Sequence, residues 1–184
     1  RNTREENKAI KEGKSISSWS TAKKRQKDTD ARWTKKNGTS FFGYKNHVSI
    51  DVGHKFIRSY DVTDASVHDS QVFTELLDPS NTSRDVWADS AYRSDNSLAK
   101  LKQQGFREHI QRKGCRHKKL TSWEQRGNRS RAKVRCRIEH VFGVMAMRTG
   151  STVMRGIGIV RIKAKIGLRN MAYNMTRYAM LAGT

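Results

Sequence analysis

Two acidic residues occupy positions at which an acid could take part in catalysis. Asp89 follows the short apolar run at residues 85–88 (DVWA), which predicts a buried strand with an acid at its carboxyl end. Active sites of α/β sheets collect at this edge, because loops there present groups that a rigid sheet holds in place. The alternative is that Asp89 or Ser90 only caps the helix that follows.

Glu139 is the second acid, on a predicted helix crowded with cations. Arg135 lies four positions before it and therefore on the same helix face, where a surface ion pair contributes only a few tenths of a kcal/mol. Glu139 also neighbours the apolar positions Ile138 and Val141, and a carboxylate beside a buried stripe costs free energy unless it is paired or binds a metal. Opposite Asp89 it would form a set of oxygen ligands suited to Mg²⁺ or Mn²⁺.

The net charge of the chain indicates its partner. The 38 Lys and Arg against 17 Asp and Glu leave +21, a charge that repels itself unless a polyanion neutralises it, so nucleic acid is the first partner to consider. A carboxylate-bound metal on such a surface predicts phosphoryl transfer on a phosphodiester, with two metals about 4 Å apart. Arg135 would then orient Glu139 or neutralise phosphate charge. The cations that we expect to hold duplex DNA by its backbone, without reading its sequence, are Lys113, Arg116, Lys118, Lys119, Arg129, Arg131 and Lys133.

The pattern along the chain predicts the elements that carry these residues. Residues 1–38 hold 12 cations against five acids, which is typical of a basic, extended or partly ordered arm that needs the rest of the protein, or DNA, to become ordered. Residues 39–182 alternate strand and helix signals, which predicts one α/β domain with a basic helical carboxyl-terminal part. The predicted strands are residues 41–52, 55–63, 85–89 and 106–111. The predicted helices are residues 66–77, 94–104, 121–145 and 159–182.

Capping signals support two of these helices. The spacing of Ser66 and Asp69, and that of Thr121 and Glu124, predicts a capping box at each start. The second helix carries a possible interruption near Gly127-Asn128. The last one keeps helical period through Ala164, Leu168, Met171, Met175 and Tyr178.

Cysteines and hydropathy exclude other classes of protein. Cys115 and Cys136 stand 21 positions apart without a Cys-x-x-Cys pair, which excludes a disulfide framework or a four-cysteine zinc site and favours free thiols in a reducing cytosol. The sequence has no run of about 18 apolar residues, so no membrane span is expected. It also begins without a methionine or a signal peptide, which we interpret as the mark of a fragment.

Four segments together carry a more specific signal. They are residues 42–47 (FGYKNH), 63–70 (TDASVHDS), 88–93 (ADSAYR) and 135–143 (RCRIEHVFG). Their order and spacing resemble the DDE transposases of bacterial insertion sequences, in the large family numbered five and its relatives in family four, over roughly residues 1–180. The resemblance implies a ribonuclease H-like domain, two Mg²⁺ ions and an Asp-Asp-Glu triad that hydrolyses the element ends and then transfers the 3′ hydroxyl into target DNA. By this resemblance Asp89 matches the second aspartate, Glu139 the glutamate and Arg135 the arginine four positions before it.

The chain departs from the family pattern at several positions. The tyrosine three before that arginine and the basic residue seven after that glutamate are replaced by Ala132 and Ala146. In the family the first aspartate lies upstream of this sequence, on a strand that sits centrally in the sheet between the second and fourth strands. We therefore expect residues 39–182 to form a catalytic domain that is incomplete at its amino-terminal strand, poorly stable and inactive alone. Asp51, which ends a predicted strand, is a less favoured source of this acid.

Three functional hypotheses follow. The first is a transposase that acts on double-stranded DNA at element ends and target, as a homodimer or higher oligomer in the active complex, in the bacterial cytoplasm at the nucleoid and not at a membrane. The second is a non-enzymatic basic nucleic-acid-binding protein, in which Asp89 is a cap and Glu139 half of an ion pair. The third is a metal-dependent nuclease of the same fold that does not transpose.

Overall fold

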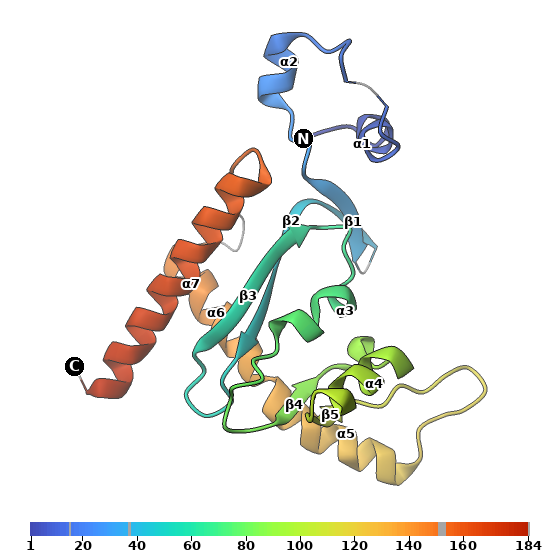
Figure 1. The fold of residues 1–184 in the computed structure, drawn as a ribbon, viewed down its shortest axis with the longest axis vertical. Helices are drawn as coiled ribbons and strands as arrows, with labels where there is room; N and C mark the ends of the chain where they lie inside the picture. The colour runs from blue at the N-terminus through green and yellow to red at the C-terminus, as the bar shows by residue number, and fades with distance from the viewer. Residues whose placement is uncertain (15, 37, 151–153, 184) are drawn as a thin grey trace.

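The alternating aromatic and branched residues of the first half form an antiparallel sheet (Figure 1). The computed structural model describes residues 1–14, 16–36, 38–150 and 154–183. In it β1 (Arg32–Lys36), β2 (Thr39–Ile50) and β3 (Ile57–Asp64) pair in the order β1-β2-β3. The two predicted strands at 41–52 and 55–63 are thus confirmed as a hairpin, joined by a turn in which Lys55 takes a positive φ of 63°.

The middle of the chain forms a second, parallel sheet of two strands. β4 (Asp85–Ala88) and β5 (Arg107–Ile110) are joined by α4 (Asp95–Gln103), which Ser94 caps and Gly105, with φ 73°, ends. The core of this unit consists of Phe73, Val86, Ala88, Leu101, Phe106 and Ile110. The predictions of a buried strand before Asp89 and of a mixed α/β fold are both confirmed.

Helix α5 (Ser122–Arg135) begins at the predicted capping box of Thr121 and Glu124. The expected interruption near Gly127-Asn128 is wrong, because α5 runs without a break to Arg135 and yields to α6 (Arg137–Thr149) at Cys136. Glycine costs a helix roughly 1 kcal/mol relative to alanine, which neighbouring contacts can offset. The spacing of Val141 and Met145 is confirmed as a core face, since both are buried in α6.

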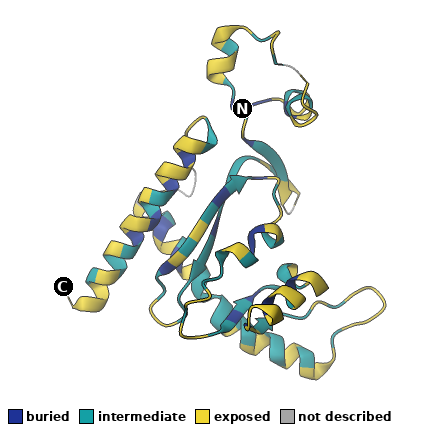
Figure 2. Ribbon diagram, in the orientation of Figure 1, coloured by how far each residue is buried: buried dark blue, intermediate teal, exposed yellow. Residues whose placement is uncertain are grey.

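Helix α7 (Ile159–Ala182) packs against β2 and β3 through the face opposite to its most regular apolar spacing. Ile162, Ile166, Asn170 and Tyr173 are buried. The periodic positions Leu168, Met171, Met175 and Tyr178 point outward, with 54–67% of each residue exposed, and the exposed stretches of α7 are yellow in Figure 2. A helix that is apolar on opposite faces has a sequence pattern that does not say which face is buried.

The first 38 residues are more ordered than their composition predicts. They form α1 (Arg4–Lys11), α2 (Thr21–Gln26) and β1, and the two helices lie at one end of the molecule (Figure 1). Polar contacts hold them: the Glu6 carboxylate caps α1 and pairs with Lys23 and Lys27, each at 2.8 Å, while buried Asn2 and Asn7 donate to backbone carbonyls. These contacts join residues distant in sequence, so composition could not indicate them.

The capping box predicted at Ser66 and Asp69 is wrong. The short helix α3 (Asp69–Val72) is capped by the His68 ring, which accepts the Ser70 N–H, and a 3-10 turn η1 (Thr74–Leu76) follows. The Ser66 hydroxyl instead donates to the Asp64 carboxylate, because it lies in the tight turn after β3. Within the described residues, none of the helices has the length and apolar character needed to cross a membrane.

Candidate active site

A cavity of about 520 Å³ separates the two sheets. Residues 47–53 at the end of β2 and residues 85–89 of β4 line it, together with side chains from α5 and α6. Residues 44–50 pair with β3 on one side only, and within the described part of the chain β4 pairs with β5 alone. Each sheet therefore has a strand edge without a partner strand beside the cavity.

Asp89 lies at the carboxyl end of β4 and lines this cavity, as the sequence predicts. Its Oδ1 accepts the Ala91 N–H at 2.7 Å and so caps the 3-10 turn η2 (Ser90–Tyr92). Capping uses one carboxylate oxygen, and the described hydrogen bonds leave Oδ2 without a partner. Burial, and after it the carboxylates of Asp69 and Asp89, raise the pKa of Tyr92 to about 12. Three polar side chains therefore gather at this edge of the sheet.

Arg135 connects the cavity to Glu139. It lines the cavity with Asp89, and its guanidinium donates to Glu139 Oε1 at 2.8 Å. Its Nε is buried and has no partner among the described residues. Glu139 itself lies one helical turn away, with its side chain 61% exposed, and is not among the residues that line the cavity. Asp89 and Arg135 thus line the same cavity, and Arg135 in turn pairs with Glu139.

The oxygen atoms at this site suit a hard divalent cation. Asp89 and Glu139 each use one carboxylate oxygen in a protein contact, which leaves the other for a metal. Within the described residues no group of three or more His, Cys, Asp or Glu is arranged to hold an ion. The two acids therefore fit Mg²⁺ or Mn²⁺ in type, and a site built on them needs a further ligand.

Asp51 lines the same cavity but is engaged in a turn. Its carboxylate accepts the His54 N–H, and its carbonyl accepts the Lys55 N–H at 3.0 Å. Its backbone N–H donates to Phe56 at 2.8 Å. These contacts make Asp51 part of the connection between β2 and β3. It stays the less favoured candidate for the missing acid.

The cations expected to contact DNA lie on the loop after β5 and on α5. Six of the seven are exposed and Arg131 is partly buried, and no ion pair of the described chain includes any of them. Their charges are therefore available to phosphate. Sequence reasoning missed Trp123, which is 64% exposed beside the Arg112 guanidinium at 5.5 Å from its ring centroid, at the base of this loop.

His47 is a cavity residue that sequence reasoning did not single out. Its Nε2 lies 2.8 Å from the Thr63 hydroxyl and its Nδ1 lies 3.4 Å from the Asp69 carboxylate, which Lys45 also approaches at 3.3 Å. The conspicuous segments 42–47 and 63–70 therefore meet in one polar cluster. The resemblance of these two segments to a known family singled them out. It could not show that they touch, because the contact joins residues of two strands and a helix.

Protonation of His47 should make the protein less stable in mild acid. Burial lowers the pKa of His47, and Lys45 lowers it too, while Asp69 and Asp61 oppose the shift. The folded pKa of His47 is below the unfolded value of about 6.5. The free energy of unfolding is therefore unaffected by this histidine above that pH, and it decreases as pH falls through the folded pKa. Urea unfolding between pH 8 and 5 should show it, with a slope of up to about 1.4 kcal/mol per pH unit.

His47→Gln should remove that pH dependence. The matched control is His117→Gln, which changes an exposed histidine of the loop after β5. An equal pH dependence in wild type and His47→Gln would contradict the assignment.

Comparison with known proteins places this geometry in a family. The sequence profile of the family described as "Transposase DDE domain" matches residues 17–175. The transposase for insertion sequence element IS1106 of Neisseria meningitidis serogroup B is 31% identical over 153 residues, which cover 83% of this chain and 53% of that protein. The chain thus spans about half the length of this curated relative. No solved structure matches it significantly. The profile match and this relative show that the chain belongs to the DDE transposases of insertion sequences.

Proposed function

We propose that the chain carries catalytic groups of a transposase that cleaves DNA at the ends of an insertion sequence and joins them to target DNA. The observation that carries this proposal is that Asp89, at the carboxyl end of β4, shares a cavity with Arg135, which holds Glu139 at 2.8 Å. Asp89 and Glu139 are the proposed metal ligands. DDE transposases use divalent metal, and Mg²⁺ or Mn²⁺ fits these oxygen donors.

We also propose that the fold is ribonuclease H-like and that a further strand completes it in the cavity between β2 and β4. The support is the cavity itself, because the residues of β2 and β4 that line it have a free strand edge. A strand there would pair with both edges and join the two sheets. It would also be placed to supply the third acid, from a segment outside residues 1–184 or from another chain. Without it the protein should be poorly stable and inactive.

The roles of the residues follow from their chemistry. The metal ions, when bound, activate the attacking oxygen and stabilise the leaving one. Arg135 orients Glu139 through this ion pair, and its guanidinium can neutralise phosphate charge. The exposed cations of α5 and of the loop after β5 hold the DNA backbone without reading its sequence.

The test is DNA cleavage by the longest protein that the gene encodes. Supercoiled DNA that carries the element ends should be cut at those ends in Mg²⁺ or Mn²⁺, with joined products, and should stay intact in EDTA. Cleavage without joining would favour a nuclease of the same fold. Tight binding with neither reaction would favour the non-enzymatic DNA-binding protein, in which Asp89 is only a cap and Glu139 only an ion-pair partner.

Two element ends in one reaction imply at least two copies of the transposase. The outward face of α7 is a surface suited to this contact, because Leu168, Met171, Met175 and Tyr178 follow one another at spacings of three and four residues. Sedimentation of the DNA complex should give two or more copies per pair of ends. A single copy would refute this part of the proposal.

A further inference from the structure

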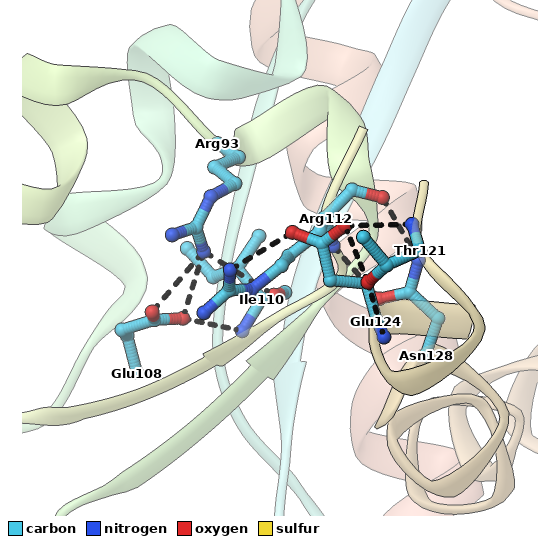
Figure 3. A network of polar contacts seen from close by, with 7 residues as sticks. All are labelled: Arg93, Glu108, Ile110, Arg112, Thr121, Glu124 and Asn128. Carbon is cyan, nitrogen blue, oxygen red and sulfur yellow. Dashed lines mark hydrogen bonds and ion pairs between the residues drawn. The ribbon is translucent and has the colours of Figure 1, made fainter. Parts of the chain in front are cut away.

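Polar contacts place helix α5 relative to the end of β4. None of its 14 residues is buried, so apolar packing contributes little to its position. The contacts that do hold it converge on the two residues that follow β5, Gln111 and Arg112, and Figure 3 shows those of Arg112. This matters because α5 ends at Arg135, beside the proposed catalytic acids.

The backbone at residues 110–112 runs beside the residue that precedes Asp89. Ala88 pairs with Ile110, and the Gln111 N–H donates to the Ala88 carbonyl at 3.1 Å. Arg93, which ends the motif that starts at Ala88, donates to the Glu108 carboxylate at 3.1 Å and 3.2 Å and reaches the Ile110 carbonyl at 3.4 Å (Figure 3). The end of β5 is therefore fixed to the end of β4.

Asn128 holds the same segment from the helix side (Figure 3). Its Oδ1 accepts the Arg112 N–H at 2.8 Å, and its Nδ2 donates to the Arg112 carbonyl at 2.9 Å. Both backbone groups of one residue are thus satisfied by one side chain, as a neighbouring strand would satisfy them. An alanine can make neither bond, and a carboxylate can make only the first. The Asn128 carbonyl also accepts from Gln111 Nε2 at 3.3 Å.

Glu124 braces this contact one turn earlier on α5. Its carboxylate accepts the Thr121 N–H at 2.9 Å and the Arg112 guanidinium at 3.0 Å. The Thr121 backbone, and after it Arg112, lower the pKa of Glu124, so the carboxylate stays charged at neutral pH. Arg112 is therefore held by its backbone at Asn128 and by its side chain at Glu124.

We propose that Asn128 is a positioning residue that sets the separation between Asp89 and the Arg135–Glu139 pair. A short chain of bonds runs from Asp89 through Ala88 and the backbone of residues 111–112 to Asn128. Helix α5 continues from there for two turns, about 10 Å, to Arg135. A displacement at Asn128 therefore passes to Arg135. The inference rests on the proposed function, in which these acids hold the metal.

A distance measurement tests the positioning without any catalysis. Spin labels are attached at Ser90→Cys, next to Asp89, and at the exposed His140→Cys, next to Glu139, with Cys115→Ser and Cys136→Ser in the full-length protein. The distance distribution between the labels should be narrow in the parent protein, should broaden and shift in Asn128→Ala, and should change less in Asn128→Asp. The control Gln125→Ala, on the same helix, should leave it unchanged, since among the described residues the Gln125 side chain donates only to the Leu120 carbonyl. An unchanged distribution in Asn128→Ala overturns the inference.

Catalysis gives the second readout. In Asn128→Ala the Mg²⁺ concentration for half-maximal DNA cleavage should rise at least about threefold, and the rate at saturating Mg²⁺ should fall roughly 10- to 100-fold, because a displacement of about 1 Å can cost that much. Duplex affinity should stay within about twofold, since Asn128 is not one of the proposed DNA contacts. A variant that cleaves like the parent at the same Mg²⁺ concentration overturns the inference. An unsubstituted protein that cleaves no DNA refutes the proposed function instead, and the spin-label distances still decide the role of Asn128.

Discussion

Asp89→Asn should abolish metal-dependent DNA cleavage, with a rate at least about 10³-fold below that of the unsubstituted full-length protein. The substitution keeps the Oδ1 that accepts the Ala91 N–H, so the cap of η2 survives. It removes the negative charge that a divalent cation needs, and a metal that stabilises the transition state by about 4 kcal/mol accounts for a loss of this size. The measurement is single-turnover cleavage of DNA with element ends at saturating Mg²⁺.

Glu139→Gln should have the same effect through the other carboxylate. Here the control is Glu75→Gln, which changes an acid of η1 that does not line the cavity and should cleave normally. Duplex affinity should not fall in any of the three variants, because the acids repel phosphate and do not bind it. Cleavage by Asp89→Asn near the unsubstituted rate would show that Asp89 is only a helix cap. Its hydrogen bond with the Ala91 N–H already fulfils that role.

The sequence predicted the secondary structure around each acid better than the arrangement of these elements in space. A buried strand before Asp89 and a helix through Glu139 follow from short-range periodicity, and both are confirmed. The path of α5 does not follow from it, because Gly127-Asn128 reads as a helix break when considered locally. The structure shows that Asn128 is held by the backbone of Arg112, a contact that spans 16 residues. Periodicity carries no information about such contacts.

The amino-terminal residues illustrate the same limit. Their composition predicts an extended or partly ordered arm, and it does not show that Glu6 binds two lysines of α2 or that Asn7 binds the Ala31 carbonyl. In α7 the apolar spacing predicted a helix with the right bounds, but Leu168 and Met171 turned outward while Ile162 and Ile166 turned inward. In each case the sequence determined the local element, and long-range contacts determined which face or partner it uses.

Reversing two cations of α5 should weaken DNA binding more than the change in net charge alone explains. Arg129→Glu with Lys133→Glu removes two exposed charges that lie four residues apart on one helix face. Each phosphate contact contributes about 0.9 to the slope of log K against log salt, so the slope should flatten by about 1.8. Affinity at 50 mM salt should fall far more than affinity at high salt, where these contacts are screened. Titration of labelled duplex at several salt concentrations measures both quantities.

The matched control separates a local contact from the general field of a protein with a charge of +21. Lys100→Glu with Lys102→Glu makes the same change in net charge on α4, where both lysines are exposed. If the DNA lies along α5, the control should lower affinity modestly through the long-range potential and leave the slope nearly unchanged. Equal slopes for the two double variants would mean that DNA binds elsewhere. Because phosphate contacts carry no sequence code, the loss in the α5 variant should be the same on element ends and on unrelated duplex.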